Sequence, residues 1–237
     1  YTVWKRRGQQ VQIRESGVPK GVISVDPEIC PRFSTTVIEV VLPLTLHEHP
    51  RRALLLGLGS GLQLETCLSF PIEEVTCVEA DSGLIHINRN LIDRRASLDP
   101  FRDERVRLIQ SSPELAVATL GNDFDVVVSQ LDHPALLRSS SAMTSEHYRR
   151  IAGCLAVDGI FCQRFHYMDF GAEPIRSIGK TLQSVFRHVA IIESAPGDLL
   201  FVATNSERGL ARPQLLTRLQ RPHVRLVLSQ LGWDWST

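Results

Sequence analysis

The sequence lacks the features that mark two large classes of protein. Its 26 Lys and Arg balance 26 Asp and Glu, so the formal net charge is zero, whereas a domain that binds nucleic acid usually carries a basic excess. The longest apolar stretches, residues 37–46 and 53–58, are far shorter than the ~20 residues that a membrane-spanning helix requires. We therefore predict no nucleic-acid partner and no bilayer-crossing segment within these residues.

Cysteines are few, and none of them forms a CxxC pair. The five are widely spaced, and Cys67, Cys77 and Cys162 lie in apolar runs, where Cys behaves as a small hydrophobic residue. This usage predicts a reducing compartment and a cytoplasmic location. The chain begins at Tyr1 with neither an initiator Met nor a signal-peptide pattern, which is also compatible with a piece of a longer protein.

Three regions differ in their patterns. Residues 1–33 alternate loosely between apolar and polar and are broken by Gly and Pro, which predicts short antiparallel strands or hairpins. Residues 34–205 switch repeatedly between strand-like apolar runs and amphipathic helical ones, a pattern typical of a doubly wound, largely parallel α/β sheet. Residues 206–237 are rich in Leu and Arg with helical spacing, and we expect a helical tail there.

The strongest chemical signal is a glycine-rich turn after a buried strand. Residues 54–61 read LLLGLGSG, with glycines at Gly57, Gly59 and Gly61. Glycine lets the backbone turn tightly and approach a ligand, and the helix that follows presents free N–H groups. The dinucleotide pattern G-x-G-x-x-G fails because position 62 is Leu. The G-x-G-x-G form instead resembles a site of the S-adenosylmethionine type.

An acidic residue stands at a matching distance downstream. Glu79 ends the second predicted strand, 22 residues after Gly57, and a carboxylate at this spacing is placed to accept hydrogen bonds from ribose hydroxyls. Alone, either feature is compatible with ordinary structure; together they predict nucleoside binding. The two histidines of the run 47–49 (HEH) lack an identifiable third ligand, so we predict no metal site.

Several segments resemble the spermidine synthase (polyamine aminopropyltransferase) family. They are LPLTLHEHPRRALLLG at 42–57, DVVVS at 125–129, MTSEHY at 143–148 and DGIFCQ at 158–163. The stretch from 219 to 233 is similar to the tail of bacterial members fused to membrane-transporter-like segments. The resemblance implies a small N-terminal β domain and a Rossmann-like domain of the S-adenosylmethionine-dependent methyltransferase type. It also implies a homodimer and, for the fused type, a soluble domain of a membrane protein whose membrane segments lie outside this chain.

The same resemblance assigns the nucleoside site. Gly57, Gly59, Gly61 and Glu79 match the family's glycine loop and ribose-binding acid. Ser112 takes the place of the Asp that touches adenine. The implied ligand is decarboxylated S-adenosylmethionine or S-adenosylmethionine, with no metal.

The catalytic positions depart from the family pattern. The family has an Asp or Glu just after the fourth strand, which deprotonates or positions the attacking amine, but the matching residue is Gln130. A carboxamide cannot take a proton at neutral pH, and loss of a general base typically slows a reaction about 10²–10⁴-fold. Asp132 is a candidate substitute. The Tyr-His-Glu segment that helps hold the polyamine corresponds to Thr35–Val37.

These observations leave three functions open. The first is a spermidine synthase-like domain, ancestrally an aminopropyltransferase acting on a polyamine, with altered catalytic positions. The second is a catalytically inactive module that senses a nucleoside or dimerises. The third is a methyltransferase that uses S-adenosylmethionine. Whether the chain is an enzyme is therefore open from sequence.

Overall fold

The computed structural model describes residues 1–6, 10–15, 17–24, 34–91, 99–121, 123–130, 141–167, 171–210 and 213–232. Its centre is a seven-stranded sheet of order β6-β5-β4-β7-β8-β10-β9. The strands are β4 (Arg52–Leu56), β5 (Glu74–Glu79), β6 (Val106–Gln110), β7 (Phe124–Ser129), β8 (Leu155–His166), β9 (His188–Ala195) and β10 (Asp198–Thr204). Strands β4 to β8 are parallel, and β10 runs antiparallel to β8 and β9.

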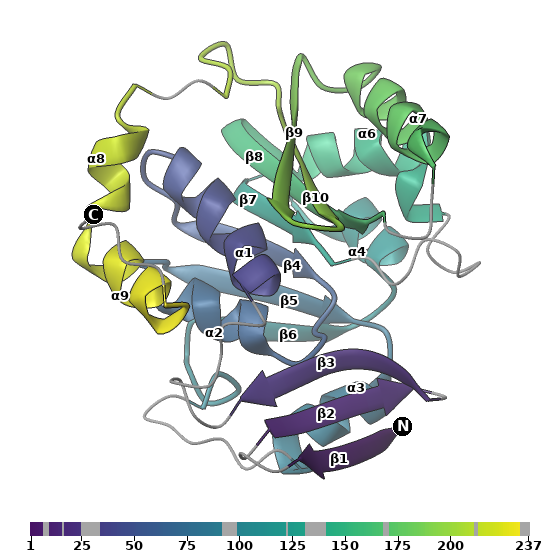
Figure 1. Cartoon of the computed structure of the whole chain (residues 1–237). Coiled ribbons are helices and arrows are strands. Elements are labelled where there is room, and N and C mark those ends of the chain that lie inside the picture. The colour runs from purple at the N-terminus through teal and green to yellow at the C-terminus, as the bar shows by residue number, and fades with distance from the viewer. Residues whose placement is uncertain are drawn as a thin grey trace.

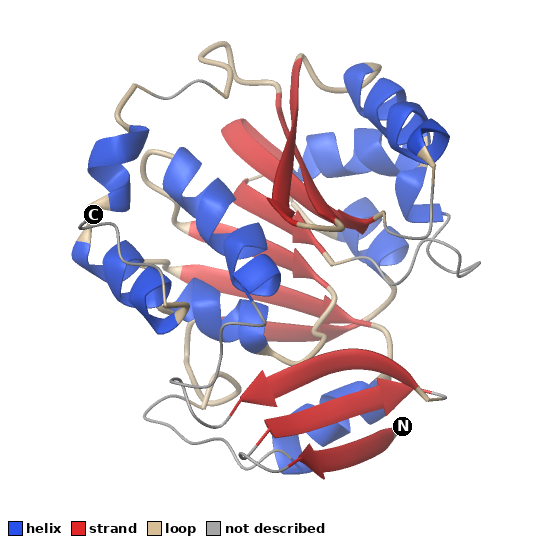
Figure 2. Ribbon diagram, viewed as in Figure 1, coloured by secondary structure: helices blue, strands red, loops and turns tan. Residues whose placement is uncertain are grey.

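Helices cover both faces of this sheet (Figures 1 and 2). Those on one face are α1 (Ser34–Leu46), α2 (Leu62–Leu68) and α9 (Pro222–Gln230), and those on the other are α4 (Pro113–Thr119), α6 (Ser145–Cys154) and α7 (Ala172–Gln183). Further helices are α3 (Ser82–His86), which continues into a π-helical turn over Ile87–Leu91, a 3₁₀ turn at Ser141–Met143, and α8 (Leu215–Leu219). The fold is therefore Rossmann-like, as predicted.

The strands are apolar because both of their faces are buried. In β4, residues from Ala53 to Leu56 are at most 1% exposed. Leu55 packs into the cluster beneath α1, α2 and α9, whereas Leu54 and Leu56 pack into the cluster beneath α4, α6 and α7. Strands of this kind read as continuous apolar runs rather than alternating ones, which is why the sequence located them.

The N-terminal strands form a second, antiparallel sheet of β1 (Thr2–Arg6), β2 (Gln10–Glu15) and β3 (Val18–Ser24). Ile13 of β2 is fully buried against Leu84 and Ile87. The hydroxyl of Tyr1 donates to Asp81 Oδ2 at 2.9 Å. This small sheet therefore lies against α3, at the end of β5 (Figure 1).

Three elements differ from the sequence-based expectation. Helix α1 forms in a segment that the sequence analysis identified as an apolar run without predicting a helix, and Pro43 lies inside this helix. The helix expected over 82–91 changes to the π-helical turn at Ile87. The strand expected over 159–163 extends over 155–166. The predicted domain boundaries after residues 33 and 205 remain predictions. Within the described residues, no helix has the length and hydropathy needed to cross a membrane.

Candidate functional site

The glycine turn links β4 to α2 at the carboxyl edge of the sheet. Gly57, Gly59 and Gly61 all have positive φ, at 110°, 51° and 80°, a region that residues with a Cβ rarely adopt. The amide of Gly57 donates to the Val78 carbonyl of β5 at 2.8 Å. The side-chain amide of Asn88, which is fully buried, donates to the Gly59 carbonyl at 2.9 Å. The path of this backbone therefore requires glycine and is held from two sides.

Glu79, at the end of β5, faces this turn. Its Oε2 accepts from the amide of Leu58 at 3.0 Å, and its Oε1 accepts from the amide of Asp81 at 2.9 Å. The side chain is partly exposed. A carboxylate has about four acceptor positions, so two amides leave capacity for the hydroxyls of a ribose.

Gln130 lies beside Gly57 and Gly59. Its amide donates to the Leu56 carbonyl at 2.9 Å, which continues the pairing of β7 with β4. A Cβ added to Gly59 would stand 2.6 Å from both Oε1 and Nε2 of Gln130, and one added to Gly57 would stand 3.2 Å from its Cβ. The carboxamide therefore lies in the space that the missing Cβ atoms leave open. Its Oε1 is buried and accepts no hydrogen bond in the described part of the chain.

Ser112 lies at the start of α4, where it already has a structural task. Its hydroxyl oxygen accepts from the Leu115 amide at 3.3 Å as the cap of the helix. Beside it, Ser141 donates to Glu114 Oε1 at 2.6 Å. Burial by itself raises the pKa of Glu114, but hydrogen bonds from Ser141, from the backbone and from Ser112 outweigh it, and the pKa is lowered. A carboxylate thus stands next to the hydroxyl that matches the adenine position.

Asp132 lies outside the described residues. Thr35–Val37 form the first turn of α1, and the carboxylate nearest to them along α1 is Glu39. Glu39 is fully buried, and its Oε2 accepts from Gln63 Nε2 at 2.8 Å. Burial raises the pKa of Glu39 to about 8, against the opposing charge of Arg164. Sequence reasoning missed this residue, although a single acid within the apolar run 37–46 was a visible signal.

Arg164, near the end of β8, also binds the carboxylate at the start of β10. Its Nε donates to Asp198 Oδ1 at 2.8 Å, and Nδ1 of His166 lies 3.3 Å from the same oxygen. Asp198 is only 8% exposed. Its negative charge is therefore largely compensated within the chain.

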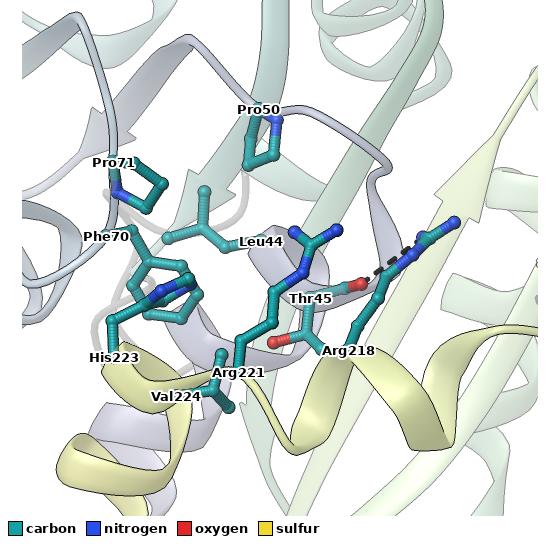
Figure 3. A pocket seen from close by; sticks show the side chains of 9 residues that line it. All are labelled: Leu44, Thr45, Pro50, Phe70, Pro71, Arg218, Arg221, His223 and Val224. Atoms are coloured by element: carbon teal, nitrogen blue, oxygen red, sulfur yellow. Dashed lines mark hydrogen bonds between the residues drawn. The ribbon is translucent and has the colours of Figure 1, made fainter.

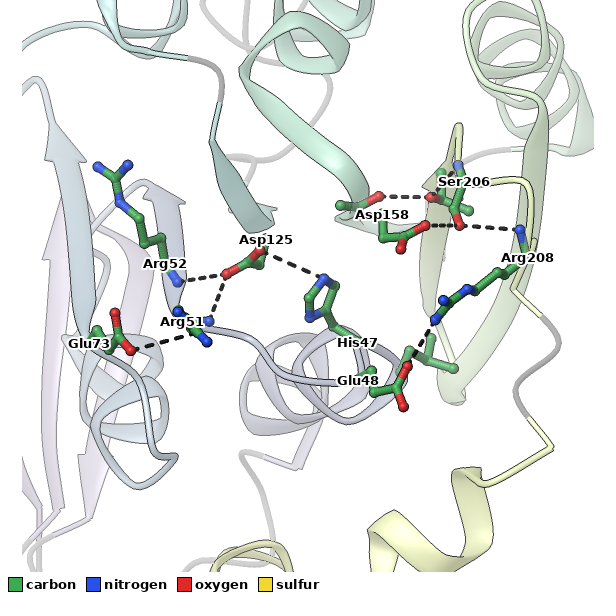
Figure 4. Close-up of polar contacts among 12 residues, drawn as sticks. His47, Glu48, Arg51, Arg52, Glu73, Asp125, Asp158, Ser206 and Arg208 are labelled. Atoms are coloured by element: carbon green, nitrogen blue, oxygen red, sulfur yellow. Dashed lines mark hydrogen bonds and ion pairs between the residues drawn. The ribbon is translucent and has the colours of Figure 1, made fainter.

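The opposite edge of the sheet, at the amino ends of β4 and β5, carries a separate pocket beside α1, α8 and α9 (Figure 3). The two histidines considered as metal ligands lie near this edge. His47 Nε2 is 3.7 Å from Asp125 Oδ1, and Glu48 pairs with Arg208 at 2.9 Å (Figure 4). Among the described residues no group of three potential metal ligands occurs.

A glycine turn after a buried central strand, with an acid at the end of the neighbouring parallel strand, defines a class of protein. It is the Rossmann-like fold of the S-adenosylmethionine-dependent methyltransferase type. Within that class, the chain belongs to the spermine/spermidine synthase domain family, whose model matches residues 35–208.

Curated relatives carry the name polyamine aminopropyltransferase. The protein of Erwinia tasmaniensis is 28% identical over 176 residues, which cover 72% of this chain and 61% of that protein. The protein of Moorella thermoacetica is 27% identical over 173 residues, which cover 70% of this chain and 60% of that protein. The chain therefore spans about three fifths of the length of these relatives.

Solved structures share the fold. A spermidine synthase in complex with the transition-state analogue AdoDATO superposes with a TM-score of 0.75 at 19% identity, covering 97% of this chain and 84% of that one. The Thermotoga maritima spermidine synthase gives 0.73 at 18% identity, covering 97% and 83%. Human methyltransferase-like protein 13 in complex with SAH gives 0.63 at 20% identity, covering 87% and 95%.

Proposed function

We propose that this chain binds decarboxylated S-adenosylmethionine or S-adenosylmethionine at the glycine turn, and that its site derives from aminopropyl transfer to a polyamine. The observation that carries the proposal is the position of Glu79, whose carboxylate is held at the glycine turn by two backbone amides. Support also comes from the relatives named as polyamine aminopropyltransferases and from the neighbours solved with AdoDATO and with SAH. A homodimer and membrane segments outside the chain remain predictions.

Each part of the site has a defined task in this proposal. Glu79 accepts hydrogen bonds from the ribose hydroxyls, and the positive-φ glycines bring the backbone close to the ligand. The buried Oε1 of Gln130 lacks a donor within the described chain. An amino group is present in both ligands, as the end of the aminopropyl chain or as the α-amino group. Such a group supplies the donor, and satisfying a buried acceptor favours binding.

The ancestral reaction requires a base that Gln130 does not supply. The acceptor nitrogen forms a bond to the carbon next to sulfur, the carbon–sulfur bond breaks, methylthioadenosine leaves as a neutral thioether, and the nitrogen loses a proton. Because the sulfonium is already activated as a leaving group, positioning and one base suffice. A carboxamide accepts no proton, so we expect turnover about 10²–10⁴-fold slower than with a carboxylate at this position.

A second candidate is a domain that binds the nucleoside without catalysis. Two observations favour it. The Gln130 carboxamide occupies the space over Gly59, and Arg164 already compensates Asp198. A dicationic polyamine needs uncompensated carboxylates or aromatic faces for binding. Because Arg164 compensates the charge of Asp198, this carboxylate is less suited to hold a polyamine.

Calorimetry and turnover distinguish these functions. Titration with decarboxylated S-adenosylmethionine, S-adenosylmethionine and methylthioadenosine should show binding, whereas release of methylthioadenosine in the presence of putrescine should be slow or absent. Gln130→Asp should raise turnover, and Gln110→Asp, the same change at an exposed position on the end of β6, should not. No binding of any of the three ligands contradicts the proposal. Binding with an inactive Gln130→Asp variant supports the second candidate.

A further inference from the structure

A pocket lies at the amino-terminal edge of the sheet, away from the glycine turn. It is enclosed by the end of α1, the segments that lead into β4 and β5, and the C-terminal helices α8 and α9 (Figure 3). It is shallow and partly open to solvent. Leu44, Phe70 and Val224 give it apolar walls, and none of the residues that line it is acidic.

Three basic side chains from the C-terminal helices line this pocket. Arg218 is 6% exposed, and one of its terminal nitrogens donates to the Leu46 carbonyl at 2.7 Å. That carbonyl belongs to the last turn of α1, where the helix dipole places partial negative charge. Arg218 is thereby fixed against α1.

Arg221 is the basic group that remains available. It lines the pocket and is partly buried, and its guanidinium has no hydrogen-bond or ion-pair partner among the described residues. Arg221 also precedes the first residue of α9, a position without a side-chain cap. The positive end of that helix dipole therefore adds to the charge of the guanidinium.

His223 completes the group. Its ring packs edge-on against Phe70, with 5.1 Å between the ring centroids. Burial, and then the charge of Arg221, lowers the pKa of His223. The His223 ring therefore carries less positive charge at neutral pH than a free imidazole does.

We propose that this pocket is an oxyanion site, in which Arg221 binds a phosphate-type group at the start of α9. Guanidinium groups bind phosphate through paired, charge-assisted hydrogen bonds, and a positive pocket without an acidic wall favours an anion over a cation or a neutral polar group. The same chemistry suits a free phosphate ester and the headgroup of an anionic phospholipid.

Isothermal titration with sodium sulfate and sodium phosphate tests the site. The native chain should bind both, and Arg221→Gln should weaken binding at least about tenfold, because hydrogen bonds to charged groups are the stronger ones. Arg225→Gln is the matched control, since Arg225 is exposed on the same helix and does not line the pocket.

Two arms identify the source of the oxyanion. Binding to phosphatidic acid vesicles but not to phosphatidylcholine vesicles, lost in Arg221→Gln, indicates a headgroup; binding of free phosphate esters alone indicates a metabolite. No binding by the native chain, or equal weakening in both variants, overturns the proposal. Methylthioadenosine should bind Arg221→Gln as tightly as it binds the native chain. A negative result for the oxyanion pocket can therefore be distinguished from a negative result for the nucleoside site.

Discussion

Replacing Glu79 by Ala tests whether its carboxylate holds the glycine turn. The change removes the acceptor of the Leu58 and Asp81 amides, at 3.0 and 2.9 Å. A hydrogen bond to a charged group contributes about 1.5–3 kcal/mol. The side chain is partly exposed, so water replaces part of this, and we expect a loss of about 2–4 kcal/mol in the free energy of unfolding. For a chain of this length that lowers Tm by about 4–16 °C.

Thermal unfolding followed by circular dichroism, with and without methylthioadenosine, measures this effect. Glu73→Ala is the control. The Glu73 side chain is 66% exposed, and its Oε1 lies 3.7 Å from Nε of Arg51. Exposed ion pairs of this kind contribute about 0–1 kcal/mol to stability. Glu79→Ala should also lose the rise in Tm that the ligand causes in the native chain.

Two results would refute the reasoning. If Glu79→Ala lowered Tm no more than Glu73→Ala, the two amide contacts would not stabilise the turn. If the ligand still raised Tm by the native amount in Glu79→Ala, the carboxylate would have no part in nucleoside binding, even where the turn itself is destabilised.

Three further predictions concern buried or polar groups. The pKa of Glu39 is raised to about 8, against 4.5 in the unfolded chain, so the stability of the native chain falls as pH rises from about 4.5 to 8. In urea unfolding, the free energy of unfolding of Glu39→Gln should therefore increase relative to that of the native chain across this pH range. Above about pH 8 the difference between the two should stay constant. Tyr148→Phe removes the donor to buried Gln163 Oε1, so it should cost about 1–3 kcal/mol, whereas Tyr167→Phe, at a more exposed contact, should cost less in the same assay. A chelator should leave Tm unchanged, and a zinc-dependent rise in Tm that His47→Ala abolishes would contradict this.

The sequence indicated the glycine turn and the acid beside it because their signals are local. Gly57, Gly59 and Gly61 follow a strand that is apolar throughout, and their backbone angles require glycine. Glu79 follows the next strand, and the carboxyl ends of neighbouring parallel strands meet at one edge of a sheet. Knowing that the strands were parallel therefore sufficed to predict that the acid faces the turn.

The sequence did not predict the contacts that depend on packing between segments far apart in the chain. The resemblance matched Gln130 to a family carboxylate, but only the pairing of β7 with β4 places its side chain over Gly59. Glu39 and Gln63 meet because α1 and α2 pack on the same face of the sheet. Helix α1 itself, with Pro43 inside it, forms where its apolar side chains are buried.

By itself, the sequence determined the α/β class, the glycine turn and the acid beside it. The periodicity of apolar residues and the need for glycine at positive φ can both be recognised in consecutive residues. The tertiary structure alone decided which side chain fills the turn, which carboxylates are compensated, and that three basic residues of the C-terminal helices line a pocket at the far edge. Those outcomes depend on contacts between segments that lie far apart in the chain, and a local pattern carries no information about them.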